Sequence, residues 1–273
     1  MKILVIGAGK MGEAIVKSWV LNNSKSKKKI TIIDTNNKRI NIIKKNYPGI
    51  EVREEIPLLW KGDLTLLAVK PQSFLDISKI INSKKINSKM FLSIMAGVNL
   101  KSLEKFINLK TAFFRAMPNL AAGIGEGVTG VYSKAPVKEV YKKKIVQLLS
   151  SLGWVYWLKK EKFFNPLTAI SGSGPAYIFL FVQIMINSSK KLGFSEKVST
   201  QLVLQTIKGA IGILEKDNNI ETLIKDVASP GGTTEAALEI LTKKKPNLMA
   251  ILNKAILAAN ERSKSLEANA KKS

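Results

Sequence analysis

The sequence of 273 residues contains no cysteine and no histidine. Without cysteine there are no disulfides, no thiol nucleophiles and no thiolate metal ligands. Without histidine the commonest proton shuttle and metal ligand is also missing. Any chemistry must use Lys, Asp, Glu, Ser, Thr, Tyr or backbone groups, and we expect no metal site. This shortage fits a reaction whose difficult step belongs to a cofactor.

Acidic residues are scarce: 20 Asp and Glu stand against 44 Lys and Arg, a formal net charge of +24. Such a balance can indicate binding to nucleic acid or to a membrane. The lysine clusters at 27–29, 142–144 and 243–245 are scattered, and none alternates with aromatic residues that could stack on bases. We therefore expect a lysine-rich composition on solvated faces, no nucleic-acid partner, and a positive field that helps to attract anionic ligands.

Long hydrophobic runs are also rare. The apolar start is broken by Gly7 and Gly12 and is followed by Glu13, which does not fit a signal peptide. The segment 167–186 is apolar but contains two serines, two glycines, a proline and Gln183. We expect this segment to be a buried helix and the protein to be cytoplasmic, without a membrane partner.

The first residues carry the clearest motif. An apolar strand at 3–6 runs into Gly7-x-Gly9-x-x-Gly12, and an amphipathic helix is expected over 11–21. In dinucleotide folds the first glycine permits a tight turn, the second lets the backbone approach a pyrophosphate, and the third lets the helix pack on the strand. The alternative is a structural turn with nothing bound. We assign cofactor binding to this turn: Ile6, Gly7, Ala8, Gly9, Lys10, Met11 and Gly12.

A second strand, 29–34, ends at Asp34, 22 residues after Gly12. An acid at this place can bond the adenosine ribose 2′-OH and favour NAD. Asn36, Lys38 and Arg39 follow and could instead hold the 2′-phosphate of NADP, and Asp34 could simply cap a helix. At this point the choice between NAD and NADP stays open.

Further strands and helices alternate as far as residue 160, which predicts an α/β Rossmann-type domain with a mainly parallel sheet. Strands are expected at 51–53, 63–70, 90–98, 111–117, 126–132 near the sheet edge, and 153–158. Helices are expected at 38–47, 57–61, 74–81, 100–106 and 137–152. Ala68, Val69, Lys70 and Pro71 end one of these strands and would lie beside the cofactor.

Residues 161–273 are expected to form an all-α domain with helices near 169–192, 195–214, 221–228, 235–241 and from 245 onward. Small residues and Pro175 predict a kink or a close contact in the first of these. The apolar faces of 177–186 and 202–214 exceed what a few helices can bury alone, which favours a homodimer. The alternative is burial against the chain's own sheet.

One break in the helical region has chemical interest. Ser229-Pro-Gly-Gly-Thr-Thr234 precedes a helix, and such a turn can offer backbone N–H groups to a carboxylate. The two threonines add hydroxyl groups that could meet a substrate heteroatom. A threonine before Glu-Ala-Ala-Leu is equally a good helix cap, so both interpretations stand.

Several motifs together resemble the pyrroline-5-carboxylate reductase family in order and spacing. They are Gly7–Gly12, Ala68–Pro71, Ala96–Val98, Arg115–Asn119, Ser171–Tyr177 and Ser229–Thr234 followed by Ala236-Ala-Leu. The resemblance implies hydride transfer from NADP(H) or NAD(H) to the C=N bond of 1-pyrroline-5-carboxylate, giving L-proline, the last step of proline biosynthesis. Such an iminium needs positioning more than a protein acid, which suits a chain without histidine.

The resemblance also implies residue roles. Ser229, Gly231, Gly232 and Thr233 would bind the substrate carboxylate, and Thr234 would hydrogen-bond the ring nitrogen as a catalytic residue. Glu161 would be a catalytic acid near the substrate. Asn36 would lie near the 2′-phosphate, and Ala96 and Gly97 would join the cofactor site. Asp34 departs from the small neutral residues common in the family, which tilts the preference towards NADH.

The family assembles through its helical domain, with the active site between one subunit's dinucleotide domain and swapped helices. The resemblance thus implies a homodimer or a higher homo-oligomer, up to a decamer built from dimers. β-Hydroxyacid dehydrogenases share the two-domain plan but need a lysine in the first helix of the second domain, and none occurs between Lys162 and Lys190. A binding protein without turnover is the other alternative, and a turnover assay separates the two.

Overall fold

The computed structural model describes the chain except for residues 23–28, 135–136, 218 and 273. Two residues of the first lysine cluster, 27 and 28, lie outside the described part. The chain forms two compact units: residues 1–172 with 260–273, and residues 173–259. The boundary at residue 160, which composition predicts, stays a prediction. The two units are described in turn.

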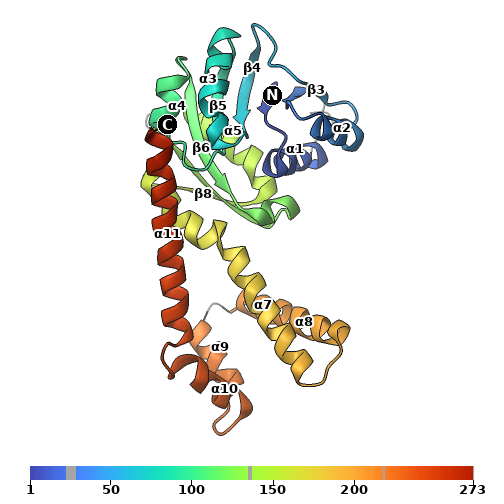
Figure 1. Ribbon diagram of the computed structural model, residues 1–273, viewed down its shortest axis with the longest axis vertical. Helices are drawn as coiled ribbons and strands as arrows, with labels where there is room; N and C mark the ends of the chain where they lie inside the picture. The colour runs from blue at the N-terminus through green and yellow to red at the C-terminus, as the bar shows by residue number, and fades with distance from the viewer. Residues whose placement is uncertain (23–28, 135–136, 218, 273) are drawn as a thin grey trace. The chain divides into compact units, whose positions relative to one another are not determined.

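The first unit is built on an eight-stranded sheet in the order β3-β2-β1-β4-β5-β6-β7-β8 (Figure 1). Neighbouring strands are parallel except for β7, which is antiparallel to β6. The mainly parallel Rossmann-type sheet is thus confirmed. The two edge strands are β3 and β8, and β7 lies between β6 and β8. The strands are β1 Ile3–Ile6, β2 Ile30–Ile33, β3 Glu51–Arg53, β4 Lys61–Leu67, β5 Asn87–Ser93, β6 Ala112–Pro118, β7 Gly127–Ser133 and β8 Gly153–Trp157.

Helices cover both faces of this sheet, so its central strands are continuous apolar runs. One buried cluster joins the sheet to α1, α2 and α5, and a second joins its other face to α3 and α4. The helices are α1 Lys10–Asn22, α2 Asn37–Asn46, α3 Phe74–Ser83, α4 Leu100–Phe106, α5 Glu139–Leu149 and α6 Phe164–Leu167. Short 3₁₀ segments are η2 Pro71–Ser73, η3 Leu120–Ile124, η4 Ser150–Leu152 and η5 Glu161–Phe163, and η6 Thr168–Gly172 is a π-helical turn.

The helix expected over 57–61 is wrong. Leu59 has a φ of 54° in a turn, and its N–H donates to the Lys84 carbonyl at 2.8 Å. β4 already begins at Lys61, because Lys61 pairs with Asn87 on β5. The ladder between β4 and β5 therefore overrides the local helical pattern.

The second unit consists of helices: α7 Gly174–Lys191, α8 Glu196–Leu214, α9 Ile220–Val227, α10 Thr233–Thr242 and the first part of α11 Leu248–Lys272. Pro175 lies in the first turn of α7, where its missing N–H costs nothing, so it does not kink the helix interior. The irregularity that small residues predict is instead the π-helical turn that precedes α7.

The prediction that α7 is buried is wrong for the single chain. No residue of α7 is buried, and Ile178, Phe179, Leu180 and Phe181 are all exposed. By length and composition, the helical stretch 161–191 could cross a membrane, with 6% of its apolar window buried. A helix that packs against a second subunit has the same composition.

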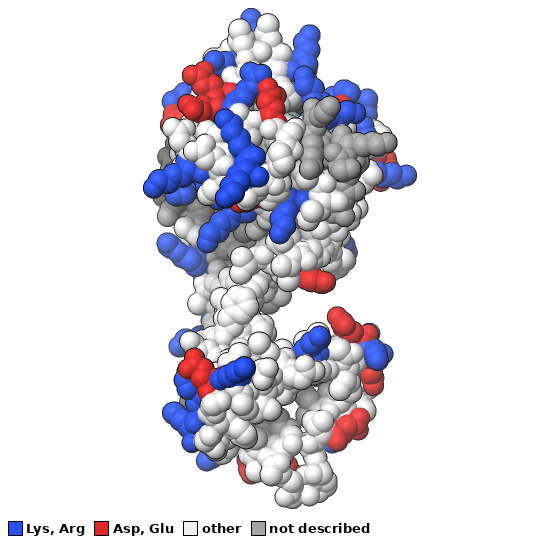
Figure 2. All heavy atoms as spheres, turned by 90° about the vertical axis from the view of Figure 1, so that its right-hand side faces the viewer, with Lys and Arg blue, Asp and Glu red and all other residues white. Residues whose placement is uncertain are grey.

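On the face of the first unit that Figure 2 shows, basic side chains lie in scattered positions. Figure 2 shows them separated by acidic and uncharged residues over the face in view, without a continuous stripe. The face of the second unit shown there is largely uncharged. This distribution supports the prediction that the lysines are solvated and form no nucleic-acid-binding surface. The absence of a nucleic-acid partner stays a prediction.

Gly153→Ala tests how β8 joins β7. Gly153 has a φ of 122°, and a Cβ there would collide with the Gly127 backbone. We expect the free energy of unfolding in urea to fall by about 2–4 kcal/mol. Gly123→Ala is the matched control, because a Cβ at Gly123 meets nothing within 4 Å. Equal stabilities of the two variants would contradict this packing.

Candidate active site

The carboxyl ends of four neighbouring strands meet at one edge of the sheet. The Gly7 N–H donates to the Ile33 carbonyl at 2.8 Å, and the Ala68 N–H donates to the Ile6 carbonyl at 2.8 Å. The Ile94 N–H extends the row by donating to the Leu67 carbonyl at 3.1 Å. β1 lies between β2 and β4, where the order of strands reverses direction. Open α/β sheets bind their ligands at this kind of point.

The three glycines of the first turn differ in what requires them. Gly7 has a φ of 101°, and a Cβ there would lie 2.6 Å from the Ala68 carbonyl oxygen. A Cβ at Gly12 would lie 2.5 Å from the Gly7 carbonyl oxygen. At Gly9, by contrast, φ is ordinary and a Cβ meets nothing within 4 Å. The protein's own packing therefore explains Gly7 and Gly12 but leaves open space at Gly9, beside the start of α1.

Dinucleotide folds place a pyrophosphate in such a position, where a glycine turn runs into a helix. The first N–H groups of α1 have no partner inside the helix, and the helix dipole favours negative charge at the same end. The contact from the Glu13 N–H to the Gly9 carbonyl at 2.9 Å shows that the helix begins immediately after Gly9. The turn thus has the geometry that its sequence predicts.

Asp34, half-buried at the end of β2, bonds this turn directly. Its Oδ2 accepts from the Ala8 N–H at 2.7 Å, and its Oδ1 accepts from the Asn36 N–H at 2.8 Å. The cap of α2 is Asn36, whose side chain accepts from the Arg39 N–H at 3.2 Å. The interpretation of Asp34 as a helix cap is therefore wrong.

Arg39 holds the turn from the other side. Its Nε and Nη2 donate to the Ala8 carbonyl at 2.8 and 2.6 Å, and Nη2 also pairs with the Glu13 carboxylate at 2.5 Å. The Tyr47 hydroxyl donates to the same carboxylate at 3.4 Å. Burial, together with the neighbouring Glu13 charge, raises the pKa of Tyr47 above its ordinary value. Sequence reasoning considered Arg39 only as a phosphate ligand and missed this clamp.

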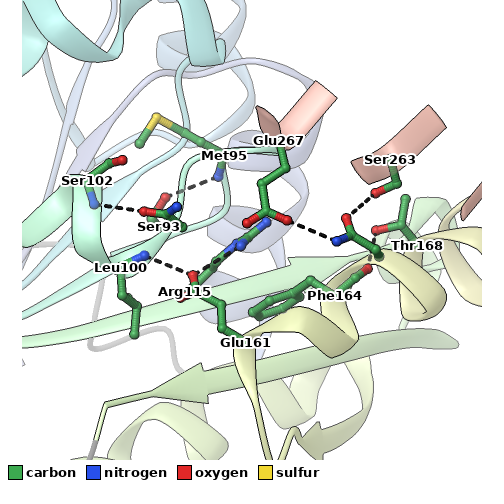
Figure 3. A network of polar contacts seen from close by, with 12 residues as sticks. Ser93, Met95, Leu100, Ser102, Arg115, Glu161, Phe164, Thr168, Ser263 and Glu267 are labelled. Atoms are coloured by element: carbon green, nitrogen blue, oxygen red, sulfur yellow. Dashed lines mark hydrogen bonds and ion pairs between the residues drawn. The ribbon is translucent and has the colours of Figure 1, made fainter. Parts of the chain in front are cut away.

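Glu161 lies beside a buried arginine (Figure 3). Arg115, on β6, has a side chain that is 5% exposed, and its Nη1 lies 3.1 Å from the Glu161 Oε1. The guanidinium stacks 4.3 Å from the centre of the Phe164 ring. The same Glu161 oxygen accepts from the Leu100 N–H at 2.8 Å. Glu161 therefore links β6 to the start of α4, directly after the turn of Ala96 and Gly97.

A third set of polar contacts joins the end of α11 to this region. The Asn165 Nδ2 donates to the Glu267 carboxylate at 2.9 Å, and the Ser263 hydroxyl donates to the Asn165 Oδ1 at 2.7 Å. Figure 3 shows both α11 side chains pointing towards this part of the first unit. Sequence reasoning missed Asn165, because nothing in its local pattern marks it.

In the second unit, Ser229–Thr234 forms a tight turn before α10. The Gly232 N–H donates to the Ser229 carbonyl at 2.9 Å, and Gly231 has a φ of 74°. Gly232, not a threonine, is the cap residue, and Thr233 begins the helix. The threonine cap is therefore wrong. The Gly231 N–H donates to the Glu235 carboxylate at 2.7 Å, a contact that sequence reasoning did not anticipate.

Comparison with known proteins defines the class. Residues 2–97 match the family model described as NADP oxidoreductase coenzyme F420-dependent, and residues 161–266 match pyrroline-5-carboxylate reductase dimerisation. The chain is an NAD(P)H-dependent oxidoreductase. It is 32% identical to the pyrroline-5-carboxylate reductase of Pasteurella multocida (strain Pm70) over 270 residues, 97% of each chain. The chain belongs to the pyrroline-5-carboxylate reductase family.

Solved structures agree over the full length. The pyrroline-5-carboxylate reductase of Coxiella burnetii is 27% identical, covers 97% of this chain and 98% of its own, and has a TM-score of 0.85. The Plasmodium falciparum pyrroline carboxylate reductase, solved with NADP bound, is 29% identical with 98% of each chain covered and a TM-score of 0.83. The fold is therefore that of the family from end to end.

Glu161→Gln tests whether this residue positions or catalyses. Gln keeps an acceptor for the Leu100 N–H but removes the charge that balances Arg115. We expect the free energy of unfolding to fall by about 1–3 kcal/mol, less than for a fully buried pair. Glu104→Gln, whose partner Lys134 is 71% exposed, is the control and should change little. A hundredfold loss of kcat at unchanged stability would instead identify a catalytic acid.

Proposed function

We propose that this chain reduces 1-pyrroline-5-carboxylate to L-proline with NAD(P)H, as the last step of proline biosynthesis, and that the turn Ser229–Thr234 binds the substrate. The observation that carries the assignment is the match of the whole chain to the pyrroline-5-carboxylate reductase family. The Gly231 N–H, which already donates to the carboxylate of Glu235, supports the turn as a carboxylate site. The substrate carries a carboxylate next to its ring nitrogen. Ser229, Gly231, Gly232 and Thr233 would hold that carboxylate, and Thr234 would bond the nitrogen.

The chemistry asks little of a protein acid. The bound nicotinamide supplies the hydride. The imine nitrogen takes a proton from water, the hydride forms a C–H bond at the imine carbon, and the C=N π pair moves to nitrogen, leaving a neutral secondary amine. Thr234 would orient the nitrogen, so that the chain contributes position and polarity. This division of labour is available to a chain without histidine or cysteine.

The cofactor residues are proposed on the geometry of the first unit. The open space at Gly9 and the start of α1 accept the pyrophosphate. The turns after β4 and β5 border the same sheet edge. The Ala68 N–H donates to the Ile6 carbonyl at the end of β1, and the Ile94 N–H donates to the Leu67 carbonyl at the end of β4. The proposed set is Ile6, Gly7, Ala8, Gly9, Lys10, Met11, Gly12, Asp34, Asn36, Ala68, Val69, Lys70, Pro71, Ala96 and Gly97.

The exposed apolar faces of α7 and α8 support a homo-oligomer. Large apolar residues such as Phe179, Phe181 and Leu204 are more than 40% exposed in the single chain. Exposed apolar surface of this extent is typical of an interface. We propose that a second copy covers it, giving a homodimer at least, from which a decamer could be built, and we propose a cytoplasmic protein with neither nucleic-acid nor membrane partner.

Thr234→Ala tests the substrate turn. Loss of the hydroxyl should lower kcat/KM for 1-pyrroline-5-carboxylate by about 30-fold, because one hydrogen bond to the reacting nitrogen is lost. Initial rates at 340 nm measure it. Thr234→Ser restores the hydroxyl and should recover most of the activity. Full activity in Thr234→Ala would remove this residue from the chemistry.

Glu235→Gln tests the same turn from the carboxylate side. Glu235 is exposed and should compete with the substrate carboxylate for the Gly231 N–H. Removing its charge should lower KM by about two- to fivefold and leave kcat unchanged, the range of one exposed polar contact. A KM that rises would show that the substrate carboxylate does not use this N–H group.

Phe179→Glu tests the interface. Light scattering should give the wild type the mass of a dimer or of a multiple of a dimer. The mass of the variant should shift towards that of the monomer, because a buried charge without a partner is costly. Lys191→Glu, at the polar end of α7, is the control and should keep the wild-type mass. A monomeric wild-type chain with full activity would contradict the proposed assembly.

A further inference from the structure

We propose that Asp34 makes this chain selective for NADH over NADPH, and that Arg39 holds the glycine turn rather than a 2′-phosphate. The inference rests on the proposed dinucleotide site and adds to it which of the two cofactors the site accepts. Both residues border the turn at Ala8, one through its N–H and the other through its carbonyl.

Asp34 is held in place at the end of β2, beside the glycine turn of the proposed cofactor site. Its two oxygens each accept one backbone N–H, from Ala8 at 2.7 Å and from Asn36 at 2.8 Å. A carboxylate has about four acceptor positions, so each oxygen can still accept from a ribose hydroxyl. A 2′-phosphate offers no such donor when ionised and brings negative charge against a fixed carboxylate. The geometry therefore favours a cofactor with a free 2′-hydroxyl on its adenosine ribose, which is NADH.

Arg39 is the cation that could offset that charge, but its Nε and Nη2 donors are already used. Nε and Nη2 both bond the Ala8 carbonyl, and Nη2 also pairs with Glu13. The side chains of Arg39 and Glu13 are only 26% and 21% exposed. Moving the guanidinium to a phosphate would leave the Ala8 carbonyl and the Glu13 carboxylate without this partner, at a cost that opposes any gain.

Two lysines near this site in the sequence change the balance little. Lys10 and Lys38 are both exposed, where water and salt screen their attraction for a phosphate. The Plasmodium falciparum relative was solved with NADP bound. The cofactor preference of this chain depends on the contacts that its own residues make, above all Asp34 and Arg39.

The test compares both cofactors in the wild type and in variants of Asp34 and Arg39. For the wild type we expect kcat/KM with NADH to exceed that with NADPH by about 30-fold or more, because the 2′-phosphate brings negative charge against the carboxylate of Asp34. Asp34→Ser removes the charge and should reverse or abolish that ratio. Arg39→Gln should lower kcat/KM with both cofactors by the same factor, because it loosens a turn that both cofactors use.

Calorimetric titration with NADH and NADPH gives the same ratios without turnover. Selective binding of NADH without reduction of 1-pyrroline-5-carboxylate would count against the reductase and leave this inference standing. An NADPH preference in the wild type, an unchanged ratio in Asp34→Ser, or a loss confined to NADPH in Arg39→Gln would each overturn it. Asp34→Asn, nearly the same in shape, separates charge from fit: a ratio that stays at the wild-type value would also overturn it.

Discussion

The close approach of three backbone segments at the first turn is the constraint on which the site depends. The turn of Gly7 lies against the strand end at Ala68, and α1 lies against Gly7 at Gly12, each too close for a side chain. The register of β1 with β2 and β4 places Ile6 opposite Ile33 and Leu67, so that these three strand ends are level. Because the backbone is fixed in this way, a ligand that reaches the turn meets N–H groups already in position.

The two arginines of this region are engaged with carboxylates. Arg39 pairs with Glu13, and Arg115 pairs with Glu161. A buried or half-buried cation of this kind anchors structure and is not available as a mobile acid or base. This suits a chain without histidine, in which the cofactor carries the reaction and the protein supplies placement. The Ala96–Gly97 turn gains from the same arrangement, since Glu161 holds the start of α4 that follows it.

The sequence predicted what repeats locally and missed what depends on distance along the chain. Apolar strands, the glycine turn and most helices follow from periods of 2 and 3.6 residues, and α4 has the predicted bounds 100–106. The Arg39 to Ala8 contact spans 31 residues, Arg115 to Glu161 spans 46, and Asn165 to Glu267 spans 102. No periodic pattern encodes such pairs. The exposed α7 was misjudged for a related reason, because an apolar helix looks the same whether its own chain or a second copy covers it.

Asp34 and Glu235 show the same device with different consequences. Each is a carboxylate that satisfies a backbone N–H, of Ala8 and of Gly231, at a turn where a ligand is expected. A ribose hydroxyl can donate to Asp34, so that residue can keep its contact while the cofactor is bound. A substrate carboxylate brings only acceptors, and two carboxylates at one N–H repel. Glu235 must then give way. In the proposed site the first acid would act as a fixed selector of the cofactor, and the second would occupy the turn until the substrate displaces it.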